Sequence, residues 1–268
     1  MPNYTSKAVV FIEQKKKIME KLFDIGRITG KRVLITGGTT GIGRALAIRL
    51  AVLGANIVIV GRHQDVIQET LEAISHDDSQ TQVLGVVADV SLQEDIDRIF
   101  LTVDEELGGL DILINNAGLA YGSVMEGGYS DWEYIVKTNL VGYMACSNYA
   151  IKVMLPNKKG HIIHIGSMSA DERGDGSSVY VATKSGLQGF SESLRKEVNP
   201  KGINVTLIDP GAVDTDMQEQ PKEEKEQKIE AMEMLMADDI VESVVYVLSQ
   251  HERTSIVELK IKPLKQII

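Results

Sequence analysis

Residues 32–43 read RVLITGGTTGIG, and this stretch decides the fold that we expect. Its first five residues form an apolar, β-branched run typical of a buried strand, and its glycines lead directly into a helical segment. A glycine turn between a strand and a helix exposes backbone N–H groups at the helix N-terminus, where the helix dipole favours a pyrophosphate. We expect Gly37 to form the turn, Gly41 to let the ligand approach and Gly43 to let the helix pack on the strand. The stretch therefore predicts a dinucleotide-binding unit.

Short apolar runs alternate with longer amphipathic segments along the rest of the chain. The runs expected as strands are 32–36, 56–60, 83–87, 111–114, 161–165, 203–208 and 255–261, and the segments expected as helices are 42–53, 65–75, 93–107, 131–155 and 179–198. Most of the runs are continuously apolar, as in strands that are buried on both faces. The alternation predicts a single α/β domain of Rossmann type, with a doubly wound parallel sheet of about seven strands flanked by helices.

Two segments lie outside this alternation. Residues 1–30 form an expected N-terminal extension, in which 7–25 have an apolar stripe at helical spacing. This stripe predicts a helix packed on the domain or on a neighbouring subunit, with a membrane-surface helix as the alternative. Residues 31–268 form the expected domain, and within it 214–237 are expected to be a lid beside the site.

Composition excludes several classes of protein. The chain has 268 residues, is 43% hydrophobic and carries a formal net charge of −10, with a single cysteine. This hydrophobic fraction is too high for a disordered chain, and one cysteine cannot form an intrachain disulfide. No apolar run approaches the ~18 residues of a membrane span, and no secretory signal is recognisable, so we expect a cytoplasmic protein without membrane partners. The acidic excess disfavours nucleic-acid binding.

The negative charge is unevenly distributed. Residues 1–35 have a net charge of +5, whereas 214–242 have a net charge of −8. An acidic lid is expected to disfavour polyanionic substrates, because it repels them from the site.

Five motifs in order, over roughly residues 31–250, resemble the short form of the short-chain dehydrogenase/reductase family. They are the T-G-x-x-x-G-x-G loop, Asn115-Asn116-Ala117-Gly118, Asn139, Ser167 with Tyr180-x-x-x-Lys184, and Pro210-Gly211-Ala212-Val213-Asp214-Thr215. The resemblance implies an enzyme that interconverts a secondary alcohol and a ketone or aldehyde by hydride transfer. It also implies a homodimer or homotetramer assembled through the helices at 131–155 and 179–198.

Tyr180 and Lys184 are four residues apart in a helical segment, so their side chains emerge on one face. A phenol with an ordinary pKa of about 10 is a poor acid or base near neutrality, and a neighbouring ammonium lowers that pKa. The pair therefore predicts a general acid/base at Tyr180. The resemblance implies that Lys184 also binds the nicotinamide ribose, that Ser167 holds the substrate oxygen, and that Asn139 anchors a proton-relaying water.

The expected cofactor is NADP(H), with NAD(H) as a possibility. The strand at 56–60 is followed by Gly61-Arg62, where an acidic residue would bind the 2′-hydroxyl of NAD. A guanidinium at this position suits a 2′-phosphate, although Arg62 is alternatively a solvated surface residue. The residues and the resemblance together place cofactor contacts at Gly37, Thr39, Thr40, Gly41, Ile42, Gly43, Arg62, Asp89, Val90, Asn116, Ala117, Gly118, Tyr180, Lys184, Pro210, Gly211, Val213 and Thr215.

The expected substrate is a small carbonyl or alcohol whose identity the sequence leaves open. Candidate contacts are Ser169, Met217 and Arg173, the last as a carboxylate anchor or as a surface ion pair. The methionines of 214–237 predict either an adaptable wall over the substrate or a stripe packed on the domain. We expect no metal site. The alternative functions are a 3-ketoacyl-thioester reductase of the same fold and a non-catalytic dinucleotide sensor.

Overall fold

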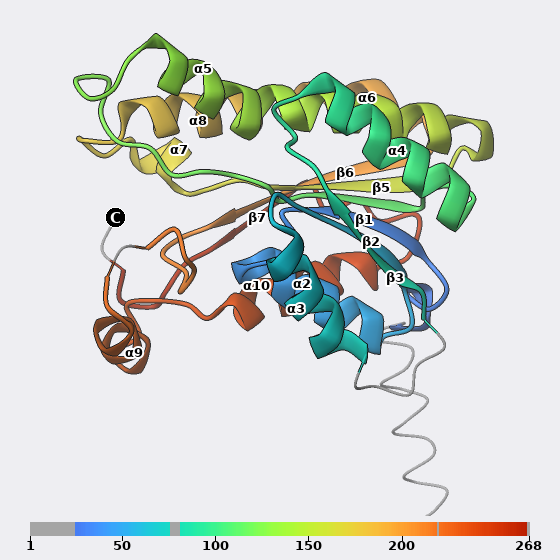
Figure 1. The fold of residues 1–268 in the computed structure, drawn as a ribbon, viewed down its shortest axis with the longest axis horizontal. Helices are drawn as coiled ribbons and strands as arrows, with labels where there is room; N and C mark the ends of the chain where they lie inside the picture. Colours follow the sequence, from blue (N-terminus) through green and yellow to red (C-terminus); the bar gives the residue numbers. More distant parts are fainter. Residues whose placement is uncertain (1–24, 76–80, 219, 267–268) are drawn as a thin grey trace, which may run out of the picture.

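In the described part of the chain, seven parallel strands form one sheet in the order β3-β2-β1-β4-β5-β6-β7 (Figure 1). The computed structural model describes residues 25–75, 81–218 and 220–266, so most of the expected extension at 1–30 lies outside the described residues. The strands are β1 (Arg32–Thr36), β2 (Asn56–Gly61), β3 (Val83–Val87), β4 (Ile112–Asn115), β5 (Gly160–Ile165), β6 (Ile203–Pro210) and β7 (Glu258–Ile261). The Rossmann-type parallel sheet that the sequence predicts is confirmed.

Helices cover both faces of the sheet, as Figure 1 shows. One layer contains α4 (Gln93–Leu107), α5 (Tyr129–Val136), α6 (Gly142–Met154), α7 (Ser169–Glu172) and α8 (Ser178–Val198), and the other contains α2 (Gly41–Val52), α3 (Gln64–Ser75), α9 (Lys222–Glu230) and α10 (Ala237–Leu248). Short helical turns are η1 (Ile25–Arg27), η3 (Leu155–Asn157) and η4 (Asn199–Lys201). A separate apolar core fills each side, which explains why the central strands are apolar at every position.

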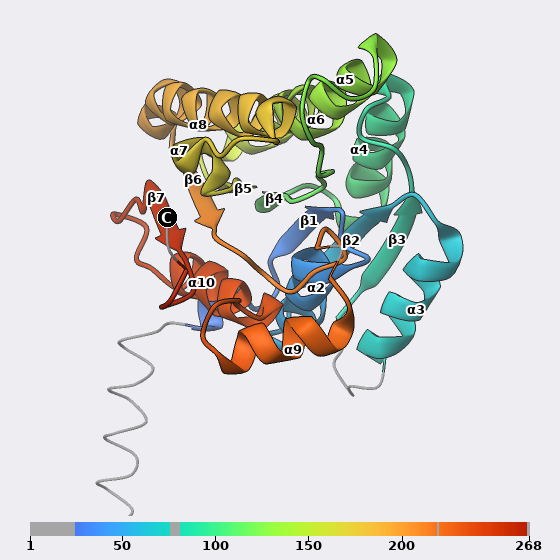
Figure 2. The same cartoon turned by 90° about the vertical axis from the view of Figure 1, so that its left-hand side faces the viewer.

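Strand β1 is the point at which the order of the strands reverses, with β2 and β3 on one side of it and β4 to β7 on the other. This strand pairs with β2 on one side and with β4 on the other, so the crossovers after it run to opposite edges. In open α/β sheets, ligands bind in the crevice at such a switch point, beyond the carboxyl ends of the strands. Figure 2 shows α7 and α9 on opposite sides of this edge of the sheet. The topology therefore places the site between the two helical layers.

The longest expected helix, at 131–155, is interrupted in the structure. Residues Lys137–Val141 form a π-helical turn, η2, between α5 and α6. A π turn inserts an extra residue into a helix and is often found at functional sites, and here it contains Asn139. Apolar periodicity does not report such an insertion, because the residues on both sides of it keep their helical spacing.

Other differences from the expected elements lie at the edges of the sheet. The strand expected at 255–261 is shortened to β7, and β3, at the other edge of the sheet, is partly exposed. The segment expected as a lid contains α9, which has no buried residue. No helix among the described residues has the length and apolar character needed to cross a membrane.

Candidate active site

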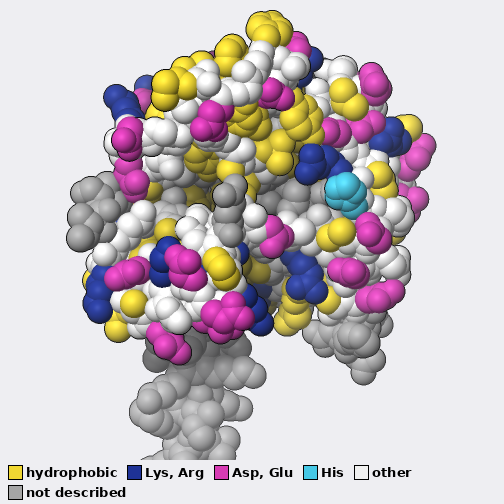
Figure 3. Space-filling view, turned by 60° about the vertical axis from the view of Figure 1, so that its left-hand side comes forward, with side chains coloured by type: hydrophobic (Ala, Val, Ile, Leu, Met, Phe, Trp, Pro, Cys, Tyr) yellow, Lys and Arg dark blue, Asp and Glu magenta, His cyan; other side chains and the backbone are white. Residues whose placement is uncertain are grey.

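A cavity of about 700 Å³ lies at the switch point, beyond the carboxyl ends of the strands. Figure 3 shows this hollowed face of the molecule, with hydrophobic side chains inside and charged side chains around it. Its lining is contributed by loops from both halves of the chain: Gly37, Thr40, Gly41, Ile42, Arg62, Asn116, Ala117, Gly118, Leu119, Ala120, Ile165, Gly166, Ser167, Met168, Ser169, Glu172, Tyr180, Lys184, Pro210, Gly211, Ala212, Val213, Thr215, Asp216, Met217, Gln218 and Gln266.

The glycine loop forms one end of the cavity. It needs glycines because a side chain at Gly37 or Gly43 would not fit. Gly37 has a left-handed φ of 64°, and a Cβ on it would lie 2.7 Å from the Ala117 Cα. A Cβ on Gly43 would lie 2.0 Å from the Gly37 carbonyl oxygen. Helix α2 then starts at Gly41 without a side-chain cap, so its first N–H groups remain available to an anion. The loop thus has the shape and the donors that a pyrophosphate requires.

Two side chains brace this loop against β4. Thr36 Oγ1 accepts hydrogen bonds from the backbone N–H groups of Asn116 (3.0 Å) and Ala117 (3.1 Å). The Asn116 amide donates to the Gly37 carbonyl oxygen at 2.8 Å. Asn116 therefore lines the cavity and also fixes the loop, a second role that sequence reasoning missed.

A smaller cavity of about 170 Å³ continues from the glycine loop toward β2 and β3. At its rim the Tyr134 hydroxyl accepts a hydrogen bond from Arg62 Nη1 at 2.8 Å and donates one to Asp89 Oδ2 at 2.8 Å. Hydrogen bonds from Ser91 and Tyr134 outweigh burial and lower the pKa of Asp89. The two predicted cofactor residues, Arg62 and Asp89, are thus joined by a tyrosine that the sequence analysis did not single out.

The same cavity contains an unpartnered polar atom. Thr138 is 5% exposed, lines the cavity, and its hydroxyl has no hydrogen-bond partner in the described structure. A buried hydroxyl without a partner is unfavourable, so it marks a place where a polar ligand atom fits. Together with the glycine loop, this observation shows that the residues present fit a nicotinamide dinucleotide.

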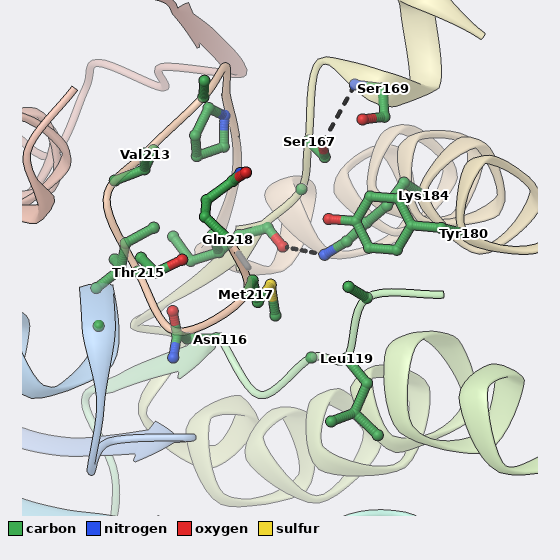
Figure 4. A pocket seen from close by; sticks show the side chains of 18 of the residues that line it. Asn116, Leu119, Ser167, Ser169, Tyr180, Lys184, Val213, Thr215, Met217 and Gln218 are labelled. Carbon is green, nitrogen blue, oxygen red and sulfur yellow. Dashed lines mark hydrogen bonds between the residues drawn. The ribbon is translucent and has the colours of Figure 1, made fainter. Parts of the chain in front are cut away.

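Ser167, Tyr180 and Lys184 lie together on the opposite wall. Figure 4 shows the Tyr180 ring beside Lys184, with its hydroxyl pointing into the cavity, and Ser167 near it. The Lys184 ammonium lies 5.7 Å from the centre of the Tyr180 ring and donates a hydrogen bond to the Ile165 carbonyl oxygen at 3.0 Å. The tertiary structure thus brings together three of the four residues predicted as catalytic.

The pKa values of this group correct one expectation. Burial raises the pKa of Tyr180 above its ordinary value, and a hydrogen bond from the Ser167 side chain opposes that shift. Burial also lowers the pKa of Lys184 to about 8, against the effect of Asp209. The structure therefore contradicts the predicted lowering of the Tyr180 pKa. Near neutral pH the phenol is protonated and the ammonium is charged.

Asn139 is fully buried, and its side chain is directed at protein atoms. Its Oδ1 accepts a hydrogen bond from the Leu119 N–H at 2.8 Å, and its Nδ2 donates to the Leu119 carbonyl oxygen at 2.8 Å. A further hydrogen bond of 3.3 Å joins Nδ2 to Thr183 Oγ1. The side chain therefore holds the loop after β4, in which Leu119 lines the cavity.

Three predicted residues do not line either cavity: Gly43, which lies behind the glycine loop, Asn139, and Arg173. Arg173 ends α7 in a left-handed conformation, and its Nε donates to the Ala170 carbonyl oxygen at 3.2 Å. Ser169 and Met217 do line the larger cavity. The carboxylate anchor considered for Arg173 is thus placed outside the site.

Three further residues at or near the site, Asp209, Glu172 and Gln266, were not predicted from the sequence. Asp209 is a single acidic residue in the otherwise apolar β6, and such an interruption is a signal that could have found it. Glu172 and Gln266 meet through a 3.5 Å hydrogen bond although 94 residues separate them, so no local pattern relates them.

Comparisons with known proteins agree with this geometry. The family model described as short chain dehydrogenase matches residues 31–226. An uncharacterized oxidoreductase of Staphylococcus aureus (strain MRSA252) is 32% identical over 237 residues, which cover 88% of this chain and 98% of that protein. An uncharacterized oxidoreductase of Staphylococcus epidermidis (strain ATCC 12228) is 31% identical over 240 residues, which cover 89% and 100%.

Two solved structures are similar in fold. A mutant short-chain dehydrogenase/reductase of Serratia marcescens matches with a TM-score of 0.78 and 27% identity, covering 88% of this chain and 98% of that one. A structure described as levodione reductase matches with a TM-score of 0.78 and 26% identity, covering 87% and 96%.

Proposed function

The chain belongs to the short-chain dehydrogenase family of oxidoreductases, and we propose that it uses NADP(H) to interconvert a secondary alcohol and a carbonyl compound. One observation carries the proposal. A tyrosine, a serine and a lysine line one wall of a cavity whose other end is the glycine loop, so a nicotinamide dinucleotide held at the loop would share this cavity with a substrate at that wall.

The proton chemistry follows from the three side chains. Bound NADPH supplies the hydride. The Ser167 hydroxyl holds the substrate oxygen, and the Tyr180 phenol donates a proton to that oxygen as negative charge develops on it. The Lys184 ammonium then stabilises the resulting phenolate, because opposite charges attract strongly in a buried site. A protonated phenol with a raised pKa and a charged lysine suit the reductive direction near neutral pH.

The preference for NADP(H) rests on Arg62. Its guanidinium lines both cavities and is held by Tyr134, so it is positioned where β2 ends. Arginine binds phosphate through two parallel N–H donors, and no acidic side chain occupies the position just after β2.

Replacing Arg62 by alanine is expected to raise KM for NADPH by roughly 10- to 100-fold, because charged hydrogen bonds to a phosphate are lost. KM for NADH should stay nearly unchanged. Initial rates with both cofactors measure this. Arg49→Ala is the control, because Arg49 pairs with Glu242 outside the cavities and its loss should alter neither value. An unaltered KM for NADPH in Arg62→Ala would contradict the proposal that Arg62 sets a preference for NADPH.

We also propose that the substrate is neutral or cationic. Of the described residues that line the larger cavity, Arg62 and Lys184 are the basic ones, and both belong to the proposed cofactor and catalytic machinery. Glu172 lines the part of the cavity beside Met168 and Ser169. A carboxylate or a phosphorylated thioester would meet repulsion there, which disfavours the 3-ketoacyl-thioester alternative.

Replacing Glu172 by glutamine is expected to increase kcat/KM for a keto acid by about 3- to 5-fold relative to the matching neutral keto ester, because it removes a partly screened repulsion. The ratio of the two kcat/KM values measures the effect. Glu230→Gln, on the exposed face of α9, removes the same charge away from the cavity and should leave the ratio unaltered. A keto acid preferred by the wild type would contradict the proposal.

The overall function is tested by following NADPH oxidation with ketones, aldehydes, keto esters and keto acids. We expect turnover with neutral carbonyl compounds. Tight NADPH binding without any oxidation would favour the alternative of a dinucleotide sensor.

A further inference from the structure

Tyr134 lies at the smaller cavity and joins two segments that are distant from it in the sequence. It is carried by α5, whereas Arg62 follows β2 and Asp89 follows β3, and all three residues line this cavity. The Tyr134 hydroxyl bonds Arg62 Nη1 at 2.8 Å and Asp89 Oδ2 at 2.8 Å. The tyrosine thus connects the residue proposed to bind the 2′-phosphate with the loop after β3.

The chemistry of the three groups fixes the direction of both hydrogen bonds. A guanidinium has N–H donors and no acceptor, and an ionised carboxylate only accepts. The Tyr134 hydroxyl therefore accepts from Arg62 and donates its own proton to Asp89. Hydrogen bonds that involve a charged group are stronger than those between neutral groups, and here both bonds are of that kind. The hydroxyl is therefore held on both sides.

Asp89 is a fixed anchor for this chain of hydrogen bonds. Its Oδ1 accepts the Ser91 N–H at 2.9 Å, and its own N–H donates to Asp95 Oδ2 at 2.6 Å. Asp95 in turn pairs with Arg98 at 2.8 Å, and the same Arg98 nitrogen donates to the Val87 carbonyl oxygen at 2.6 Å. The carboxylate is thus held between the end of β3 and the first turns of α4.

The side chain of Arg62 needs such support because it is exposed. A long exposed side chain samples many rotamers, and ordering it when a ligand binds reduces the affinity. Among the described residues, the Tyr134 hydroxyl is the hydrogen-bond partner of this guanidinium, so its Nε and Nη2 donors remain available. Arginine binds phosphate through two parallel N–H donors. The tyrosine thus orders the guanidinium and leaves it the donors that a phosphate requires.

The hydroxyl also stands between the guanidinium and the Asp89 carboxylate, because it bonds both. A direct pair between Arg62 and Asp89 would engage further N–H donors of the guanidinium and offset its charge. Both effects would oppose the binding of a phosphate. The phenol therefore links the two charged groups and leaves most of the guanidinium unengaged.

We propose that Tyr134 determines cofactor specificity as a positioning residue, whose hydroxyl holds the Arg62 guanidinium in place for the 2′-phosphate of NADPH. The inference rests on the proposed preference for NADP(H) and extends it to a residue that acts through Arg62. NADH has no 2′-phosphate, so its binding should not depend on the hydroxyl.

The positioning is tested first in the free protein, by ¹⁵N relaxation of the Arg62 Nε–H group, assigned with Arg62→Ala. The test variant is Tyr134→Phe, which keeps the ring and removes only the hydroxyl. We expect the order parameter of this group to lie above about 0.6 in the wild type and to fall below that value, into the range of flexible groups, in the variant. Equal mobility of Arg62 in the two proteins overturns the positioning.

The effect on specificity is measured as the dissociation constants of NADPH and NADH by isothermal titration. Tyr134→Phe should raise the Kd for NADPH by roughly 3- to 10-fold, the effect of ordering one long side chain, and leave that for NADH within about twofold. An unaltered or lower Kd for NADPH, or an equal rise for both cofactors, overturns the inference. Tyr149→Phe is the matched control, because the Tyr149 hydroxyl also donates to an aspartate, Asp97, but lines neither cavity, so both Kd values should stay unaltered.

A double-mutant cycle shows whether Tyr134 acts through Arg62. In the Arg62→Ala background, Tyr134→Phe should change the Kd for NADPH by less than about twofold, because the group that it positions is gone. An equal loss in both backgrounds means that Tyr134 contacts the cofactor itself or supports only the fold, and overturns the inference.

The same measurements separate a failure of this inference from a failure of the proposed function. Weaker NADPH binding in Arg62→Ala, with unaltered binding in Tyr134→Phe, defeats the inference alone. Unaltered NADPH binding in Arg62→Ala defeats the proposed preference and the inference with it. Neither the relaxation nor the titration requires turnover, so a failure to find a reduced carbonyl compound would defeat the proposed reaction and leave the role of Tyr134 standing.

Discussion

Replacing Tyr180 by phenylalanine should reduce kcat/KM for carbonyl reduction by about 1,000-fold, within the range that positioned general acids contribute. Phenylalanine keeps the ring that lies 5.7 Å from the Lys184 ammonium and removes only the hydroxyl that donates the proton. The substrate oxygen would then have to take its proton from water, at a barrier about 4 kcal/mol higher for that loss of rate. The packing of α8 should be unaffected.

Single-turnover rates and NADPH fluorescence titration measure this prediction together. The dissociation constant for NADPH should stay within about threefold of the wild-type value, because Arg62 and the glycine loop are unaltered. Tyr121→Phe is the control, since the Tyr121 hydroxyl bonds the Glu126 carbonyl oxygen and does not line the cavities. Turnover near the wild-type rate in Tyr180→Phe would refute the acid/base role.

Replacing Gly43 by alanine is the second large effect, and it is expected to weaken NADPH binding by more than about 100-fold. The new Cβ would lie 2.0 Å from the Gly37 carbonyl oxygen and 2.5 Å from Asn116 Nδ2. Neither atom can move away easily, because the first belongs to the backbone and the second donates a 2.8 Å hydrogen bond to that same carbonyl oxygen. The loop must move away from the helix, at an expected loss of stability of about 1–3 kcal/mol.

Isothermal titration with NADPH and urea unfolding test this prediction. Gly189→Ala, in the middle of α8, is the matched control, because its Cβ would meet no atom within 4 Å. Removing a helical glycine at such a place stabilises a helix by about 0.5–1 kcal/mol, so the control should bind NADPH normally and unfold no earlier than the wild type. Wild-type binding by Gly43→Ala would show that the loop does not hold the cofactor.

The direction of the Tyr180 pKa shift depends on the tertiary structure. The sequence spacing of Tyr180 and Lys184 predicts a lowered tyrosine pKa, yet burial raises it. Spacing reports which side chains share a helix face, but the pKa depends on how much water and which charges surround the hydroxyl. Those surroundings include Ser167 and Asp209, which lie outside the helix that carries Tyr180.

The amino-acid sequence alone determined the fold, the glycine loop and the placement of Tyr180 and Lys184 on one helix face. Each of these rests on short-range information: apolar runs that only a buried strand accommodates, glycines where no Cβ fits, and a four-residue spacing on one helix. Right-handed crossovers restrict how parallel strands can be joined, but the order β3-β2-β1-β4-β5-β6-β7 came only from the structure. Ser167 followed only from the resemblance to the family.

Only the tertiary structure decided how these residues are supported. Asp209 accepts a hydrogen bond from the Ser167 N–H, and Tyr134 accepts one from Arg62, which is 72 residues away. Asn139, in a π-helical turn, accepts one from the Leu119 N–H. Arg173 donates a hydrogen bond to the Ala170 carbonyl oxygen and does not line the cavity. Such contacts depend on the distances and burial that packing creates between remote segments, and a local pattern contains neither quantity.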